Sequence, residues 1–299
     1  AGGLVPVRRG GSVHTRALRF RGGDGHEYNF RSIDKEFSPS MPEFARETFV
    51  DWIRQDITSA SIPTAPVIAA ALLDSVGVLN PGPRVYVLPD DPALGEFRTE
   101  FAGMLGTLEV HPEAGGDGAP PFAGATHVVD TEDLLRHLQE DLNHRVDARA
   151  FLKARLLDVL MGDFDRHGGQ WRWAGYDRDG LIWWVPIPED RDYAFVDNRG
   201  LFFSIARTAG VDRLVTFDER YPPMLSMLDN SLPLTRRLLA ELSWSDWQAA
   251  VGELMSELTD ARIRAAVMTL PPAHYALRGE QLIRTLLARR DRLPEAARE

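Results

Sequence analysis

The sequence changes in character at residues 115–124, GGDGAPPFAG, where glycine and proline are concentrated. Before this segment, short β-rich runs alternate with glycine turns, a pattern typical of a strand meander. After it, apolar residues recur mainly at helical spacing. A chain of 299 residues is long enough for two packed lobes. We therefore predict an α+β protein with a small β-rich lobe at residues 1–114, a linker at 115–124 and a larger, mainly helical lobe at 125–299.

The first lobe is predicted to begin with three strands separated by the turns GGS and GGDG. These strands are expected at residues 4–9, 14–20 and 26–33. Two helices follow, one over residues 41–60 with apolar residues on one face and a largely buried one over 65–78. The β-rich run RVYVLP comes next. This order predicts a sheet on which a helix packs.

The second lobe carries clear start signals for helices. Asp130 and Asp147 each precede a run with helical periodicity and are predicted N-caps. Two β-like runs, QWRWAGY and LIWWVPI, flank the segment Asp177–Gly180, DRDG, whose sequence is typical of a hairpin turn. From about Leu232 onward, the pattern predicts several amphipathic helices.

The composition excludes several classes of function. A formal net charge of −10 argues against nucleic-acid binding, because contact with phosphates requires a basic surface. No apolar run approaches the roughly 18 residues that a membrane span needs. Cysteine is absent, so disulfides and thiolate chemistry are excluded and no compartment is indicated. The chain begins AGGLVPV without an initiator methionine, and we expect a processed or excised segment of a longer protein whose localisation stays open.

Acidic residues are concentrated in two segments that the predicted elements can bring into one cleft. GDFDRHGGQW follows a predicted helix and precedes the hairpin, and the hairpin ends at Glu189, Asp190 and Asp192. Loops held on rigid elements commonly carry active sites. Phosphoryl transfer requires a carboxylate that orients or deprotonates the acceptor, and oxygen ligands for Mg²⁺. Asp165 is the candidate base, and Gln170 follows it by five residues, the spacing of the Asp and Asn in the protein-kinase catalytic loop.

The motifs DRHGGQ and DRDYAF, within residues 158–195, resemble those of the atypical kinases. That superfamily includes phosphatidylinositol kinases, HipA-like toxin kinases, spore-coat-protein-H-type kinases and Golgi secretory-pathway kinases. By this resemblance Asp165 matches the catalytic aspartate, and Gln170 matches the metal-binding amide, where Asn is usual. Asp190 matches the metal-binding aspartate, and Asp192 is a candidate second ligand. The resemblance implies a two-lobed protein-kinase-like fold that binds ATP with Mg²⁺ or Mn²⁺.

A glycine turn between the first two strands covers the nucleotide phosphates in such a fold. The residues at that place are Gly10, Gly11 and Ser12, whose backbone amides can face an anion. A plain hairpin turn explains the same three residues equally well.

The third strand of such a fold should carry a cation for the phosphates. Arg31 lies in the middle of this strand and is favoured, although lysine is the usual residue. Lys35, at the end of the strand, is a competing candidate. The following helix should supply an acidic partner, and Asp56 or Glu47 could serve. A surface ion pair is the alternative explanation for Arg31.

The acidic loops also admit interpretations other than a catalytic one. The run D-x-D-x-x-G from Asp163 begins like an EF-hand, but Ala174 stands where such a loop requires glutamate, so a calcium loop is excluded. A solvated turn with a structural Asp–Arg contact is a second alternative, and we expect His167 to support the loop by hydrogen bonding. The segment EDRDYAF alone would fit an exposed acidic turn, and its pairing with DRHGGQ favours a functional role.

The sequence thus leads us to expect an ATP- and divalent-metal-dependent phosphotransferase acting on a hydroxyl acceptor. The acceptor is expected to be a protein, a peptide or a small molecule, and no sequence feature selects among them. Two alternatives stay open. One is an enzyme of the same fold that transfers AMP, and the other is a nucleotide-binding pseudokinase or scaffold module, for which Gln170 and the missing strand lysine are the reasons.

Overall fold

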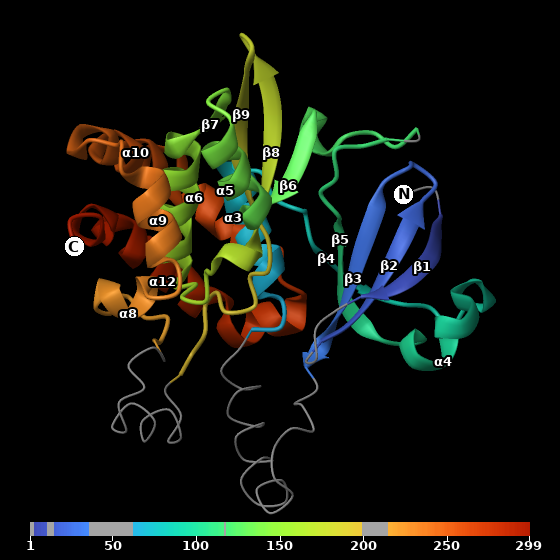
Figure 1. The fold of residues 1–299 in the computed structure, drawn as a ribbon. Coiled ribbons are helices and arrows are strands. Elements are labelled where there is room, and N and C mark those ends of the chain that lie inside the picture. Colours follow the sequence, from blue (N-terminus) through green and yellow to red (C-terminus); the bar gives the residue numbers. More distant parts are fainter. Residues whose placement is uncertain (1–2, 11–14, 36–61, 117, 199–214) are drawn as a thin grey trace, which may run out of the picture.

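The computed structural model describes residues 3–10, 15–35, 62–116, 118–198 and 215–299. Within these residues the chain forms a small β-rich lobe beside a larger lobe that is mainly helical (Figure 1). The α+β, two-lobed fold predicted from the sequence is therefore confirmed. In the part of the chain that the structure covers, no helix combines the length and the apolar character needed to cross a membrane.

The small lobe is built on a five-stranded antiparallel sheet in the order β1-β2-β3-β5-β4. The strands are β1 Leu4–Gly10, β2 Thr15–Gly22, β3 Glu27–Lys35, β4 Arg84–Val87 and β5 Leu105–Val110. The three strands predicted at the start of the chain are therefore present. Leu18, Phe20 and Phe30 form the core of this lobe together with Phe101 from the short helix α4 Arg98–Phe101 and Leu94 from the 3₁₀ turn η1 Pro92–Phe97.

The large lobe contains a second sheet, in the order β6-β8-β9-β7. Its strands are β6 His127–Asp130, β7 His144–Val146, β8 Trp171–Arg178 and β9 Leu181–Pro188. The predicted hairpin between β8 and β9 is confirmed. Asp179 and Gly180 form its two-residue turn with φ values of 52° and 77°, both in the left-handed region that such tight hairpin turns require.

Helices form most of the large lobe, with the 3₁₀ turns η2 Phe122–Gly124 and η3 Gly168–Gln170. They are α3 Ala65–Ser75, α5 Thr131–Glu140, α6 Ala148–Met161, α8 Met224–Leu228, α9 Leu232–Leu239, α10 Trp244–Glu257, α11 Asp260–Val267 and α12 Pro272–Ala296. Asp130 and Asp147 cap α5 and α6 as predicted, because their side chains accept hydrogen bonds from the backbone N–H groups three residues on.

Helix α3 lies among the helices of the large lobe, although it precedes β4 and β5 in the sequence (Figure 1). Its apolar residues, among them Ile68 and Leu72, join the same core as Phe151 and Leu157 of α6. The chain therefore passes from the small lobe to the large one, returns for β4 and β5, and then runs through residues 115–124 into β6. The placing of the lobe boundary at that segment stays a prediction.

Candidate active site

The acidic loop begins where α6 ends. Gly162 adopts φ 70° and its N–H caps the last turn of the helix, a conformation that glycine accepts at little cost. The loop then runs through η3 into β8. Thr131 Oγ1 donates to the carbonyl of Gly168 at 2.6 Å, and His167 Nδ1 accepts from Gly169 N–H at 3.1 Å. His167 thus has the supporting contact expected of it.

Asp165 is half-buried, and each of its carboxylate oxygens faces a side-chain amide. Oδ1 accepts a hydrogen bond from Asn230 Nδ2 at 3.0 Å, and Oδ2 lies 3.5 Å from Gln170 Nε2. Burial raises the pKa of Asp165 above its ordinary value, and the Asp190 carboxylate adds to this rise, whereas His167 opposes it. A carboxyl group with a raised pKa is better matched to proton transfer near neutral pH.

Gln170 is buried and links the two acidic segments. Its Oε1 accepts from Arg166 Nη1 at 3.1 Å, and its backbone oxygen accepts from Arg166 Nη2 at 3.0 Å and from Glu189 N–H at 2.9 Å. The amide is therefore oriented with its oxygen toward the guanidinium and its nitrogen toward Asp165. A metal ion that used this oxygen would compete with Arg166, so the predicted ligand role of Gln170 stays a prediction.

Arg166 also holds the second acidic segment, directly after β9. Its Nη1 donates to the backbone oxygens of Glu189 and Asp190 at 2.5 and 2.9 Å. Asp190 adopts φ 51°, in the left-handed region that is strained for residues other than glycine. Such strain costs roughly 1–3 kcal/mol and persists only where surrounding contacts enforce it. The bond from Arg166 to the Asp190 carbonyl is one such contact.

A buried cluster of charged side chains lies beneath both segments. It consists of Arg155, Asp158, Asp163, Arg166 and Arg191. Asp158 accepts hydrogen bonds from Arg155 and Arg191 and lies 3.6 Å from Arg166 Nε, while Asp163 lies 3.1 Å from Arg191 Nη1. Burial favours a higher pKa for Asp158, but the surrounding arginines hold it below its usual range. Burial dominates at Asp163 and raises its pKa to about 6.

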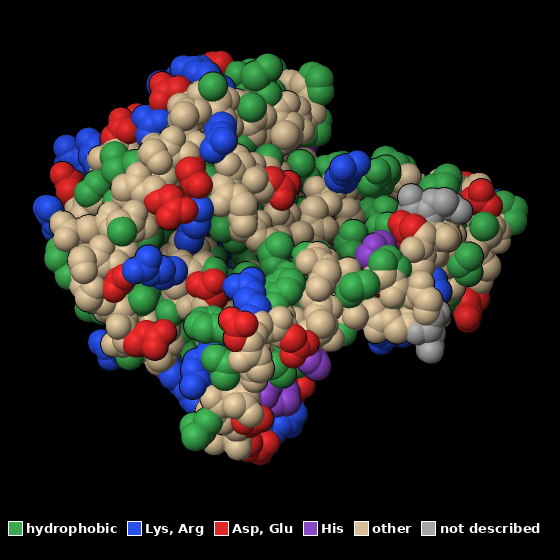
Figure 2. All heavy atoms as spheres, turned by 90° about the horizontal axis from the view of Figure 1, so that it is seen from above, with side chains coloured by type: hydrophobic (Ala, Val, Ile, Leu, Met, Phe, Trp, Pro, Cys, Tyr) green, Lys and Arg blue, Asp and Glu red, His purple; other side chains and the backbone are tan. Residues whose placement is uncertain are grey.

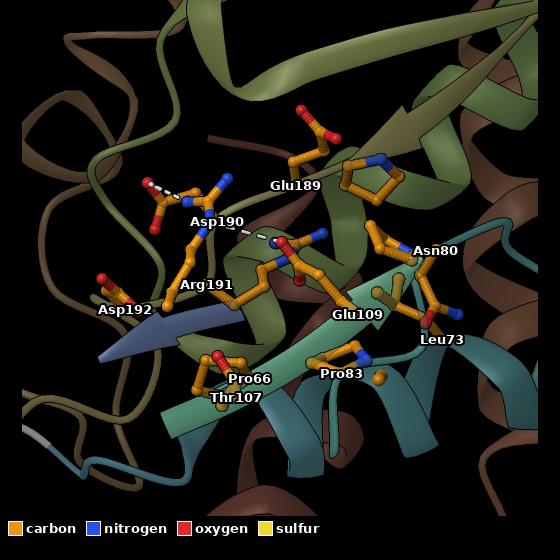
Figure 3. A pocket seen from close by; sticks show the side chains of 14 residues that line it. Pro66, Leu73, Asn80, Pro83, Thr107, Glu109, Glu189, Asp190, Arg191 and Asp192 are labelled. Atoms are coloured by element: carbon orange, nitrogen blue, oxygen red, sulfur yellow. Dashed lines mark ion pairs between the residues drawn. The ribbon is translucent and has the colours of Figure 1, made fainter. Parts of the chain in front are cut away.

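Arg31 crosses from the small lobe to the acidic segment. Its Nη1 lies 3.5 Å from Asp190 Oδ2, and its Nε lies 3.3 Å from Glu109 Oε1 on β5 (Figure 3). Glu109 is 7 % exposed, and burial raises the pKa of its carboxyl to about 7 despite the opposing effect of Arg31. Arg31 therefore has an acidic partner on the neighbouring strand, while the partners predicted on the following helix lie outside the described residues.

A pocket lies between the small lobe, α3 and the acidic segment. Arg31, Thr107 and Glu109 contribute from the sheet, Pro66 and Leu73 from α3, and Glu189, Asp190 and Asp192 from the segment after β9 (Figure 3). The pocket thus joins an apolar wall to a group of carboxylates and a cation. Polar groups converging on one side of an apolar pocket are typical of a ligand site.

The structure brings together part of the predicted site. Asp165, Gln170 and Asp190 are linked through direct contacts or through Arg166, and Arg31 reaches Asp190 from the other lobe. Asp192 lines the pocket, and Gly10 ends β1 opposite Ala17. Predicted residues outside the described part are Gly11, Ser12, Glu47 and Asp56, and Lys35 is described only as the end of β3.

Three site residues were not found from the sequence: Arg166 as the link between the motifs, Glu109 as the partner of Arg31, and Asn230 beside Asp165. A signal existed for Glu109. Glu109 on β5 lies opposite Asn29 on β3, and Asn29 is two residues before Arg31 on the same strand. Side chains alternate between the two faces of a strand, so Glu109 and Arg31 lie on the same face of the sheet. No comparable local signal marks Asn230, which lies 65 residues beyond Asp165.

Three carboxylates of the site are possible ligands for a divalent cation. Carboxylate oxygens are the ligands that Mg²⁺ and Mn²⁺ prefer, and Asp165, Asp190 and Asp192 supply them around the pocket and its adjoining loop. Among the described residues, no three acidic or histidine side chains already stand at the spacing of a metal site. A divalent cation at these carboxylates would therefore need further oxygen ligands from water or from phosphate, which Mg²⁺ commonly takes.

No family model matches the sequence, and no curated protein matches it in sequence. Several solved structures are similar to the chain. The proinflammatory kinase CtkA of Helicobacter pylori is 12% identical, with 94% of this chain and 92% of CtkA covered and a TM-score of 0.43. HipA of Shewanella oneidensis MR-1, solved with HipB and operator DNA, is 14% identical over 99% of this chain and 68% of HipA, with a TM-score of 0.45. The Golgi casein kinase is 12% identical, with 97% of this chain and 71% of the casein kinase covered and a TM-score of 0.36.

Proposed function

We propose that this protein is an ATP- and divalent-metal-dependent phosphotransferase that acts on a hydroxyl acceptor. The observation that carries the proposal is the environment of Asp165. Its carboxylate is held by two amides, has a raised pKa, and lies next to the acidic segment that Arg31 meets from the opposite lobe. This combination supports a base on the loop next to the pocket, with cation ligands and a phosphate-binding group in the pocket lining.

Each group has a distinct task in this proposal. Asp165 orients the acceptor hydroxyl and accepts its proton as the oxygen attacks the γ-phosphorus of ATP. The bond from that phosphorus to the β–γ bridging oxygen breaks, and ADP leaves. Asp190 and Asp192 would hold the divalent cation. The amide oxygen of Gln170, which the motif predicts as a ligand, would join them by giving up its bond from Arg166. When bound, the cation neutralises charge that develops on the phosphate oxygens. Arg31 binds a phosphate group with its guanidinium, and this exchanges its contact with Asp190 for one with the nucleotide.

A nucleotide-binding module without turnover is the second candidate. Two observations favour it: the oxygen of Gln170 is already bound by Arg166, and Arg31 is already paired with Glu109 and Asp190. Such a protein would bind ATP without turning it over, and the variants Asp165→Asn and Asp190→Asn would be as inactive as the wild type.

The test is ATP turnover by the wild type, Asp165→Asn and Asp190→Asn with Mg²⁺ and with Mn²⁺. Asp133→Asn is the matched control, because Asp133 lies on the surface of α5 and pairs with Arg136. We expect Asp165→Asn to lose about 10²-fold or more in turnover while it still binds nucleotide, since it removes only the proton acceptor. Asp190→Asn should also lose the added thermal stabilisation that the cation gives in the presence of nucleotide.

The mass of the modified acceptor distinguishes the two transfer reactions. Addition of one phosphate supports phosphoryl transfer, whereas addition of a whole nucleotide identifies AMP transfer by the same site. Turnover in both variants equal to that of the wild type would refute the assignment of the site. Absence of turnover with retained nucleotide binding would favour the second candidate.

A further inference from the structure

The junction between α8 and α9 reaches the candidate base. Asn230 lies in this junction, between Leu228 and Leu232, and is partly buried. Its Nδ2 donates to Asp165 Oδ1 at 3.0 Å, which is the shorter of the two amide contacts that Asp165 makes. A residue far along the chain therefore contacts the carboxylate on which the proposed chemistry depends.

The neighbouring residue fixes the junction to the interior of the lobe. Ser231 is 3 % exposed, and its Oγ accepts from Arg155 Nη2 at 2.6 Å and donates to the carbonyl of Leu228 at 2.9 Å. Arg155 also donates to Asp158 in the buried charged cluster. The backbone that carries Asn230 is thus connected to α6, the helix from which the Asp165 loop emerges.

The two amides together determine the orientation of the Asp165 side chain. A carboxylate held at one oxygen can still turn about its terminal bond, whereas partners at both oxygens fix the plane of the group. Gln170 approaches Oδ2 at 3.5 Å, the limit of a hydrogen bond, so the firmer contact is that of Asn230. Asn230 can serve here only as a donor, because the ionised carboxylate accepts and does not donate.

We propose that Asn230 is a positioning residue for the transfer reaction: it holds Oδ1 of Asp165 so that the remaining lone pairs of the carboxylate face the acceptor hydroxyl. This inference rests on the proposed phosphotransferase function. It assigns a role to the α8–α9 junction, which contains no part of either acidic motif. A misplaced catalytic group can cost about 10²-fold in rate even where substrate binding is intact.

The test compares Asn230→Asp and Asn230→Ala with the wild type. Asn230→Asp keeps the shape of the side chain but replaces the donor with a carboxylate that repels Asp165. We expect both variants to lower kcat about 10- to 100-fold with the KM for ATP changed by less than about twofold, because the contact is made to the base and not to the nucleotide. Asn143→Ala, an exposed asparagine of the same lobe, is the control and should keep wild-type kinetics.

A double-mutant cycle gives a second readout that needs no turnover. The changes in unfolding free energy caused by Asn230→Ala and Asp165→Ala should be non-additive, because each removes the partner of the other. Additive changes in unfolding free energy would overturn the role of Asn230 and leave the proposed function standing. The same conclusion would follow if the wild type were active and Asn230→Asp had the same kcat. A wild type without ATP turnover under any metal condition would instead overturn the proposed function.

Discussion

Substitution of Asp158 by asparagine should destabilise the protein more than removal of Arg155 from the same cluster. Asp158 is fully buried and is shared by Arg155, Arg166 and Arg191. With Asp163 as the second acid, the cluster contains three guanidinium groups and two carboxylates. Asp158→Asn would leave three buried positive charges facing one negative charge, with almost no change in volume.

The expected magnitude follows from this charge balance. Removal of one partner from a buried ion pair costs about 3–5 kcal/mol, because the other partner stays buried without compensation. Arg155→Met has a smaller effect, since it leaves two arginines with two aspartates. Its main cost is the hydrogen bond from Arg155 to Ser231, worth about 1 kcal/mol. The order of the two variants thus tests whether Asp158 is the limiting charge.

Denaturant unfolding followed by tryptophan fluorescence would measure both variants. Trp171 is a suitable reporter, because the Arg166 guanidinium lies 4.7 Å from the centroid of its ring. Asp133→Asn, which breaks an exposed ion pair with Arg136, should change the unfolding free energy by less than about 1 kcal/mol. The reasoning would be refuted if Asp158→Asn were no more destabilising than this control, or if Arg155→Met cost more than Asp158→Asn.

Two further predictions concern other buried charges. Burial raises the folded-state pKa of Glu109 from 4.5 to about 7, so the unfolded chain releases this proton first as the pH rises. As the pH rises from 4.5 to 7, the unfolding free energy of the wild type should therefore fall by on the order of 3 kcal/mol relative to that of Glu109→Gln. Urea titrations at a series of pH values measure this, and an equal dependence of unfolding free energy on pH in the two proteins would contradict it. Arg289 is fully buried and donates to the carbonyls of Val159 and Leu160 at the end of α6. Arg289→Met should cost about 3 kcal/mol in urea unfolding, because the Leu160 carbonyl loses its guanidinium donor and the Val159 carbonyl keeps only the N–H of Gly162. A loss below about 1 kcal/mol would show that solvent replaces the guanidinium.

The elements that the sequence predicted well have local causes. Asp179 and Gly180 determine a tight hairpin by their own backbone preferences, and Asp130 and Asp147 cap helices through contacts three residues away. The motif residues Asp165 and Gln170 also lie on one short loop, with Gln170 Nε2 3.5 Å from Asp165 Oδ2, and their roles stay predictions. Such turns and caps depend on residues that are close together in the sequence, so their sequence patterns predict them.

Contacts between distant segments escaped prediction for the opposite reason. Helix α3 has an apolar sequence that suits either lobe, and only the packed structure places Ile68 and Leu72 against α6. Glu109 was not predicted as the partner of Arg31, because the kinase-like resemblance places that partner on the following helix, whereas the contact depends on the pairing of β3 with β5. The partner of Asp165 at Asn230 depends on how the α8–α9 junction folds back, which no local pattern specifies.

In both acidic motifs an aspartate is followed directly by an arginine, and the two residues lie in different surroundings. Arg166 and Arg191 are both buried and both pair with Asp158 and Asp163, whereas Asp165 and Asp190 remain partly exposed at the loop and the pocket. A loop that presents carboxylates must resist their mutual repulsion and the strain at Asp190. The buried arginines supply this resistance from below, through backbone carbonyls and the shared aspartates. Arg166 thus fixes the backbone of both motifs, at Gln170 and at Glu189 and Asp190, while Arg191 ties the second motif to the buried aspartates beneath it.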